Sequence, residues 1–344
     1  MEKAELSSDL PKAHASKVKV NRSVKLGKVW DTVCENGIFM FTATSALIIV
    51  FIFIFILIKA WNIFKVNGLG FILESGFDKQ IIEAFNAPAE KPVWKFGALG
   101  LLLGSLYTTL IALIIAVPMG LGTAIVITEL SPNWMKGLLQ SFIRLLASIP
   151  SVIFGLIGLL VVVPFIQSKI ITVEMQIEYI KYFQLSGNSL LAGVIVLSIM
   201  ITPIIVALSV DAINAVPHRY KEASLALGLS HWRTIVKVII PAAKSGITAG
   251  IILGTGRAIG EALALSMVSG GLGNIPNPSQ GIVFFLTPVL TLASAIINKS
   301  EAMAVSSIEA ALFACGVLLL ITCTTLSLFT KIVERIIQRR EGIE

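Results

Sequence analysis

Six long apolar segments constrain the fold of this chain more than any other feature. A helix needs about 20 apolar residues to cross the hydrocarbon of a bilayer. Hydrophobic residues make up 56% of the 344 residues and charged residues only 14%, whereas soluble domains carry about 25% charged residues. A soluble fold could not cover so much apolar surface, so the sequence predicts an all-α polytopic membrane protein. Its six transmembrane helices are predicted at residues 37–61, 97–127, 137–165, 188–210, 245–270 and 302–330.

Two of these segments contain residues that disrupt helices. Pro118 lies inside the second segment and Pro150 inside the third. Proline lacks the backbone donor and clashes with the preceding turn, so we expect these two helices to kink or to end early. Arg144, near the start of the third segment, places the apolar part of that segment at about residues 145–165.

The distribution of lysine and arginine predicts the orientation of the chain. Of the 27 such residues, 18 lie in the tails 1–36 and 331–344 and in the loops after the second and fourth segments, and eight lie in the other loops. Positive loops stay on the cytoplasmic side, so both termini are predicted to be cytoplasmic. The outer loop 62–96 contains a predicted interfacial helix within 74–85. The net charge of +7 thus reflects topology and not binding of nucleic acid.

Neither a metal site nor an ATP-binding motif is recognisable in the sequence. The three cysteines and three histidines form no cluster with ligand spacing, and the phosphate-binding pattern G-x-x-x-x-G-K-[ST] does not occur. The stretch GTGRAIG, at 254–260, has its third glycine displaced from the dinucleotide fingerprint, and no strand precedes it. We therefore expect no catalytic residues, no metal and no cofactor on this chain, and an ATPase, if one takes part, on another chain.

The largest predicted cytoplasmic loop, 211–245, has the pattern of two helices joined by a turn. Pro217 suits the first turn of a helix, and Gly228 can supply the left-handed residue that ends it. Ser230 can cap a second helix, which Pro241 is expected to terminate or bend. The loop carries more apolar residues than a solvated linker needs, so it must dock either on the protein's own core or in a groove of a partner. These residues are Leu225, Leu227, Trp232, Ile235, Val236 and Ile239.

This loop resembles the EAA loop of ABC importer permeases. The tripeptide Glu222-Ala223-Ser224 is followed after three residues by Gly228 and after nine more by a stretch that ends in Pro241. The usual pattern is Glu-Ala-Ala, three residues, Gly, nine residues and Ile-x-Leu-Pro, so the spacing is intact and Ser224 replaces the second alanine. The resemblance implies a type I ABC importer permease fold, with its core at 97–330. It also implies that the loop couples to a groove on an ATP-binding subunit.

Three further stretches are similar to the permease subunits of phosphate importers of the PstC type. They are 96–132, 145–164 and 256–270, and the resemblance covers about residues 30–340. It implies transport of inorganic phosphate across the plasma membrane (the inner membrane) of a bacterium or archaeon. The implied partners are a PstA-like permease, two PstB-like subunits that hold ATP and Mg, and a PstS-like extracytoplasmic phosphate-binding protein. Permeases for sulfate or molybdate share some of these elements, and a PstA-type subunit is similar too, so these identities stay open.

Arg257 and Glu261 place two charges inside the fifth segment, where charged residues are costly and mark functional sites. Gly246, Gly250 and Gly254 repeat every four residues, and the two charges continue the series on one face of a helix. Because glycines let another helix approach closely, we expect the charged pair to face protein or a cavity.

Two interpretations of this pair remain open. Arg257 and Glu261 could form an ion pair four residues apart that neutralises itself and fixes helix packing. Alternatively, the donor fork of Arg257 could bind an oxyanion in the translocation pathway, with Glu261 orienting it. Ser151, next to Pro150, could line the same pathway. A secondary anion carrier would also use a buried arginine, but carriers have two related halves, which this sequence lacks. A membrane-embedded scaffold or sensor would need no pathway.

Overall fold

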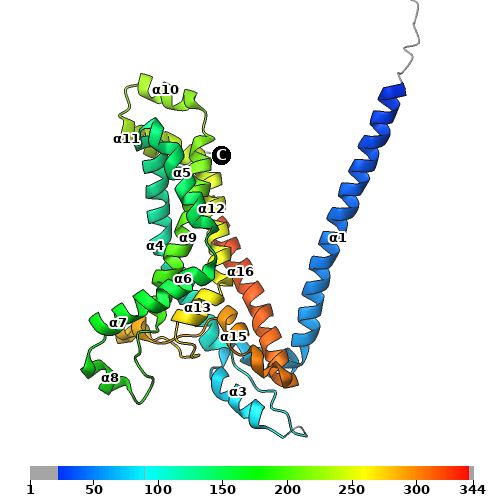
Figure 1. The fold of residues 1–344 in the computed structure, drawn as a ribbon, viewed down its shortest axis with the longest axis vertical. Helices are drawn as coiled ribbons and strands as arrows, with labels where there is room; N and C mark the ends of the chain where they lie inside the picture. Colours follow the sequence, from blue (N-terminus) through cyan, green and yellow to red (C-terminus); the bar gives the residue numbers. More distant parts are fainter. Residues whose placement is uncertain (1–21, 89, 341–344) are drawn as a thin grey trace, which may run out of the picture. The chain divides into compact units, whose positions relative to one another are not determined.

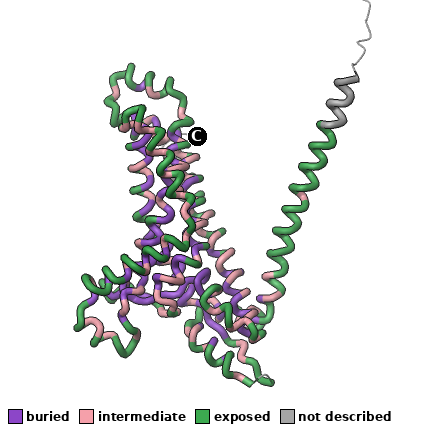
Figure 2. Tube along the Cα trace, in the orientation of Figure 1, coloured by how far each residue is buried: buried purple, intermediate pink, exposed green. Residues whose placement is uncertain are grey.

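The computed structural model describes residues 22–88 and 90–340, and these are almost entirely helical (Figure 1). The chain divides into two compact units, with the boundary between Phe55 and Ile56. The first unit contains the N-terminal part of α1 (Arg22–Asn67). From Asp31 to Phe55 nearly every side chain of this helix is exposed (Figure 2). Because this stretch is apolar on all sides, it suits an environment of lipid or of another membrane protein.

The described residues contain six stretches that are long and apolar enough to cross a membrane, which confirms the predicted number. They correspond one by one to the six predicted segments, with shifted ends. The stretches are Asp31–Asn67, Leu99–Leu130, Ser151–Lys169, Leu190–Asn214, His231–Gly260 and Ser306–Ile332.

Helix α9 (Leu190–Asn214) forms the centre of the second unit. Two thirds of its most apolar stretch is buried inside the protein. Helices α4 (Leu99–Ile125) and α12 (Ile240–Gly260) pack along it, and α16 (Ser306–Arg340) packs against α12. Figure 2 shows the buried residues concentrated along these helices and at the end of the unit that holds α13 and α15.

The glycines of α12 allow the close contact between α12 and α9. A Cβ atom on Gly246 would lie 2.5 Å from the Cβ of Ala212, and one on Gly250 would lie 3.0 Å from the Cβ of Leu208. Both of these neighbours belong to α9. The predicted packing role of the glycine series is therefore confirmed for these positions.

Substitution of Gly246 by alanine is expected to destabilise the protein, because the new methyl group would overlap Ala212. Overpacking of this kind costs about 1–3 kcal/mol. The matched control is Gly122→Ala, also inside a helix, where the added Cβ meets no atom within 4 Å. Thermal unfolding of the purified chain in detergent measures both. A variant at Gly246 as stable as the one at Gly122 would contradict the packing described here.

Three π-helical turns interrupt the regular α-helical geometry of the membrane helices. They are η1 (Val126–Leu130), η2 (Gly158–Val162) and η3 (Ile235–Ile239). The second segment does not end at Pro118, because α4 runs through it and continues into η1. Pro241 does not terminate its helix either. The N–H of Ile240 bonds to the carbonyl of Ile235, and the helix then continues through Pro241 as α12.

The third predicted segment is not a single helix, which corrects the range 137–165. Helix α5 (Asn133–Ser148) ends before Pro150, whose extended backbone begins α6 (Ser151–Ile157). The chain then continues through η2 into α7 (Val163–Lys169). The break has a local cause, since proline disfavours a helical conformation in the residue before it. The membrane-spanning stretch therefore begins at Ser151 and excludes Arg144.

The loop 62–96 and several later connections form short helices, of which α2, α3, α15 and η5 pack on α4 or α16. The expected helix within 74–85 is confirmed as α3, in which Phe77, Ile81 and Ala84 are buried. The carboxylate of Asp78 accepts a 2.6 Å hydrogen bond from the N–H of Gly273, which ties this loop to the segment after α13. The short helices are α2 (Gly70–Leu73), α3 (Phe77–Asn86), α8 (Val173–Tyr179), η4 (Pro278–Gln280), α14 (Ile282–Leu286), α15 (Leu292–Asn298) and η5 (Ser300–Ala304).

Candidate functional site

The loop 211–245, here called the coupling segment, folds as the predicted pair of helices. Helix α10 (His218–Ala226) is followed by Gly228, whose φ of +81° is left-handed. The hydroxyl of Ser230 then accepts a 3.4 Å hydrogen bond from the N–H of Arg233 and begins α11 (His231–Thr234). Gly228 therefore supplies the predicted left-handed backbone, and Ser230 supplies the predicted side-chain cap. The second helix runs through η3 into α12, so the segment connects directly to the membrane.

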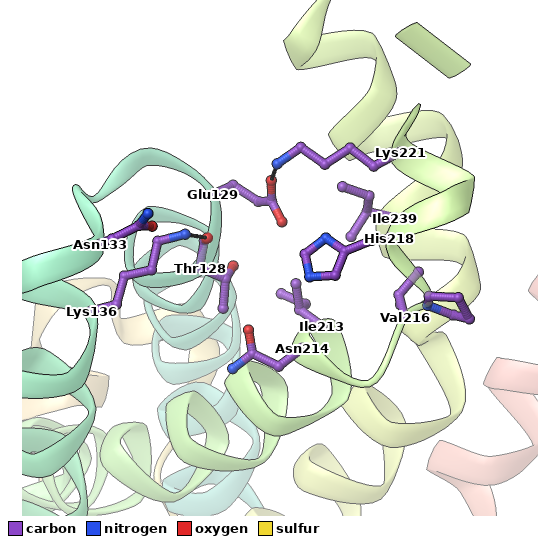
Figure 3. A pocket seen from close by; sticks show the side chains of 11 residues that line it. Thr128, Glu129, Asn133, Lys136, Ile213, Asn214, Val216, His218, Lys221 and Ile239 are labelled. Carbon is purple, nitrogen blue, oxygen red and sulfur yellow. Dashed lines mark hydrogen bonds and ion pairs between the residues drawn. The ribbon is translucent and has the colours of Figure 1, made fainter. Parts of the chain in front are cut away.

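Two contacts hold α10 against the rest of the protein. The Lys221 ammonium lies 2.6 Å from a carboxylate oxygen of Glu129, at the end of the second membrane stretch (Figure 3). The buried hydroxyl of Ser224 lies 3.0 Å from the hydroxyl of Thr234. Ser224 is the residue that departs from the alanine of the EAA pattern, and its hydroxyl joins the two helices of the coupling segment. A shift of α10 is thereby linked to the ends of α4 and α12.

Some apolar residues of the coupling segment pack in the protein's own core, and others remain exposed to a partner. Ile235 and Ile239 are buried and pack in the core between α4 and α9. Leu227 and Trp232 remain 83% and 60% exposed, and Glu222 and Ala223 are exposed beside them. We call the exposed set the docking face: Glu222, Ala223, Leu225, Leu227 and Trp232. This arrangement leaves an apolar surface with a carboxylate available to another subunit.

The charged pair of the fifth segment does not lie on one continuous helix, which corrects the sequence prediction. Helix α12 ends at Gly260, and Glu261 has an extended backbone with ψ of 114°. The chain then starts α13 (Leu263–Val268). Glu261 is 7% exposed, and its carboxylate accepts a 3.0 Å hydrogen bond from the N–H of Ala264. Of the ion pairs among the described residues, none joins it to Arg257.

Arg257 lies on a wide apolar groove between α9 and α12. The groove has a volume of about 890 Å³ and is otherwise lined by aliphatic residues and glycine, including Ile204 and Leu208 of α9. Arg257 is half-buried and makes no hydrogen bond with another described residue. Its guanidinium therefore keeps its donors available at the depth of the membrane helices. A partner or a passing anion can use these donors.

Ser151 begins α6, the helix that packs against α13. The contact is close, because a Cβ on Gly155 would lie 2.8 Å from the Cα of Ala264. The two interrupted helices of the third and fifth segments thus meet, with the buried Glu261 at the start of α13. No described hydrogen bond joins Ser151 to Arg257 or Glu261.

The residues that surround α10 at its base were not predicted from the sequence. Glu129 and Lys221 are 92 positions apart, and the ammonium of Lys136 donates a 2.6 Å hydrogen bond to the carbonyl of Thr128. The acidic Glu129 at the end of a long apolar segment was a signal that the sequence alone offered. Its partner could not be identified without the fold.

Comparisons with known proteins agree with this architecture. Residues 116–339 match the family described as "Binding-protein-dependent transport system inner membrane component". The chain is 39% identical over 237 residues to the "Probable ABC transporter permease protein YqgH" of Bacillus subtilis, covering 68% of this chain and 70% of the relative. It is 32% identical over 314 residues to the phosphate transport system permease protein PstC of Pasteurella multocida, covering 89% of this chain and 90% of the relative.

The fold is also similar to that of a chain in a solved bacterial alginate ABC transporter, determined in complex with an alginate-bound periplasmic protein. The TM-score is 0.52 at 15% identity, covering 90% of this chain and 98% of the other. At this identity the similarity concerns the fold alone. Together with the six membrane helices and the coupling segment, the family match shows that this chain belongs to the binding-protein-dependent transport system inner membrane components, the integral membrane permease subunits of ABC importers.

Proposed function

We propose that this chain is a permease subunit of an ATP-driven importer for inorganic phosphate. The observation that carries the proposal is the coupling segment, which is anchored to the membrane helices and exposes a docking face. A segment built in this way serves to receive movement from another subunit. The phosphate transport permeases among its relatives, similar over most of their length, support phosphate as the substrate.

The proposed assembly contains a second, PstA-like permease, two PstB-like subunits that bind ATP and Mg, and a PstS-like phosphate-binding protein. Both termini lie on the cytoplasmic side of the bacterial or archaeal plasma membrane, together with the coupling segment. This orientation rests on the excess of lysine and arginine in those regions. The chain itself contributes the lipid-embedded pathway and no catalytic residue.

In the proposed mechanism, the docking face inserts into a groove of the ATP-binding subunit. Closure of the two ATP-binding subunits on ATP would move α10. The Lys221–Glu129 and Ser224–Thr234 contacts would then pass this movement to α4 and α12. The pathway would open outward, accept the anion from the binding protein, and return inward after hydrolysis.

Arg257 is the residue proposed to meet the anion. A phosphate ion that leaves water needs compensating positive charge and hydrogen bonds, and the Arg257 guanidinium has unused donors in a groove of about 890 Å³. The partner permease would complete this groove. We assign Glu261 the role of holding the start of α13 through the N–H of Ala264, and Ser151 a position near the same pathway.

Uptake of radiolabelled phosphate by cells that carry this chain with its partner subunits tests the proposed substrate. We expect uptake that requires ATP and is reduced by unlabelled phosphate, but not by equal concentrations of sulfate or molybdate. Competition by sulfate or molybdate instead of phosphate would reassign the substrate and leave the permease function intact. Uptake that continues without the ATP-binding subunits would point to a secondary carrier and contradict the proposal.

A further inference from the structure

A polar cavity of about 390 Å³ lies at the base of α10, apart from the Arg257 groove (Figure 3). Five elements contribute to its lining: the turn η1, the beginning of α5, the end of α9, the beginning of α10 and the end of η3. Its volume lies within the range of small-molecule pockets, about 300–1,000 Å³. The polar side chains that matter here are Glu129, Asn133, Lys136, Asn214, His218 and Lys221.

The charges around this cavity are predominantly positive. Lys136 and Lys221 contribute two ammonium groups, whereas Glu129 contributes one carboxylate. Each ammonium has three donors, and one is used in each case. Lys136 donates to the carbonyl of Thr128 and Lys221 contacts Glu129, both at 2.6 Å. The remaining donors are available to a ligand.

Three further polar side chains of the cavity have no competing partner among the described residues, whereas the Thr128 hydroxyl donates to the carbonyl of Ala124. Asn133, Asn214 and His218 make no side-chain hydrogen bond to the part of the chain that the structure describes. Asn133 and His218 are the first residues of α5 and α10, and the first N–H groups of a helix lack partners within the helix. Together with the two ammonium groups, the side-chain amides and the imidazole give the lining several unused donors.

We propose that this cavity binds a phosphate-bearing anion, with Lys136, Lys221 and His218 as its main ligands. A phosphate group offers several acceptor oxygens and negative charge, which match two ammonium groups and an imidazole. The phosphate can come from free inorganic phosphate or from the headgroup of an anionic lipid. Both sources reach this position, since the cavity lies at the predicted cytoplasmic ends of α4 and α9. A bound anion would join α5 to α10 and so hold the coupling segment against the membrane helices.

Binding of radiolabelled inorganic phosphate to the full-length chain in nanodiscs tests the proposal. The background variant Arg257→Gln removes any contribution from the pathway, and the discs contain either phosphatidylcholine alone or added phosphatidylglycerol. Lys136→Met removes one ligand. Asn133→Asp adds a negative charge, but it keeps α5 intact because an acidic residue is favourable in a first helical turn. Lys331→Met, at an exposed position in α16, is the matched control.

In phosphatidylcholine discs we expect Lys136→Met and Asn133→Asp each to weaken phosphate binding by about tenfold or more, which corresponds to loss of one charge-assisted hydrogen bond. Lys331→Met should leave it unchanged. If lipid is the natural source, phosphatidylglycerol will compete with phosphate and will be retained by the purified chain, but less so in the two variants. If neither phosphate binding nor lipid retention depends on Lys136 and Asn133, the proposal is wrong.

Discussion

Replacement of Arg257 by glutamine is expected to reduce phosphate uptake by about tenfold to a hundredfold, while the chain still inserts and binds its ATP-binding subunits. Glutamine retains hydrogen-bond donors but removes the charge. Hydrogen bonds to charged groups contribute about 1.5–3 kcal/mol, and 1.4 kcal/mol corresponds to a factor of ten. Radiolabelled uptake measures the loss, and the amount of chain in purified membranes with co-purified ATP-binding subunits measures assembly. Normal uptake by this variant would remove Arg257 from the pathway.

Two companion variants distinguish an anion site from simple charge pairing. Lys65→Gln removes an exposed charge from α1 and should leave uptake unchanged. The exchange Arg257→Glu with Glu261→Arg would restore transport if the two side chains only neutralised each other. We expect no restoration, because Glu261 lies beyond the end of α12 and its carboxylate binds the N–H of Ala264. An arginine at this position cannot accept that hydrogen bond.

Replacement of Leu227 by aspartate is expected to abolish co-purification of the ATP-binding subunits and to reduce uptake to background. Leu227 is 83% exposed, so the substitution costs the isolated chain little. In the complex, however, a carboxylate would be buried in an apolar groove without a partner, which is strongly unfavourable. Affinity purification of the tagged chain, followed by quantification of the bound ATP-binding subunits, measures the effect.

The matched control for this variant is Ile177→Asp. Ile177 is also an exposed aliphatic residue, but it belongs to α8 (Val173–Tyr179), on the predicted extracytoplasmic side. We expect normal recovery of the ATP-binding subunits with Ile177→Asp. Equal recovery with both variants would show that the docking face does not contact these subunits, and would leave the membrane part of the proposed mechanism unaffected.

The features that the sequence predicted correctly depend on short stretches of chain. The six membrane helices follow from runs of apolar residues, which must form helices because lipid offers no other partner for the backbone. The turn of the coupling segment follows from Gly228, which accepts a left-handed backbone, and from Ser230, which caps the next helix. The helix break at Pro150 is local in the same way, although the prediction joined its two sides into one segment.

The end of α12 at Gly260 was not predictable from the local sequence. The residues from Ala262 to Leu265 favour a helix, so nothing nearby demands an extended backbone at Glu261. Instead, α13 packs against α6 and α9. Ala264 lies against Gly155, while Leu265 and Val268 are buried in a core with Val163 and Val196. Burial of these side chains outweighs the continuation of one helix and thereby separates Arg257 from Glu261.

The sequence by itself determined the number and approximate positions of the membrane helices, the turn of the coupling segment, and the residue types available for the proposed anion binding and coupling. Only the tertiary structure decided which of these residues meet. The Lys221–Glu129 ion pair joins positions 92 residues apart, and the division of the coupling segment into a buried and an exposed face depends on the core between α4 and α9. Local backbone conformation depends on neighbouring residues, whereas contacts between distant residues depend on how whole helices pack.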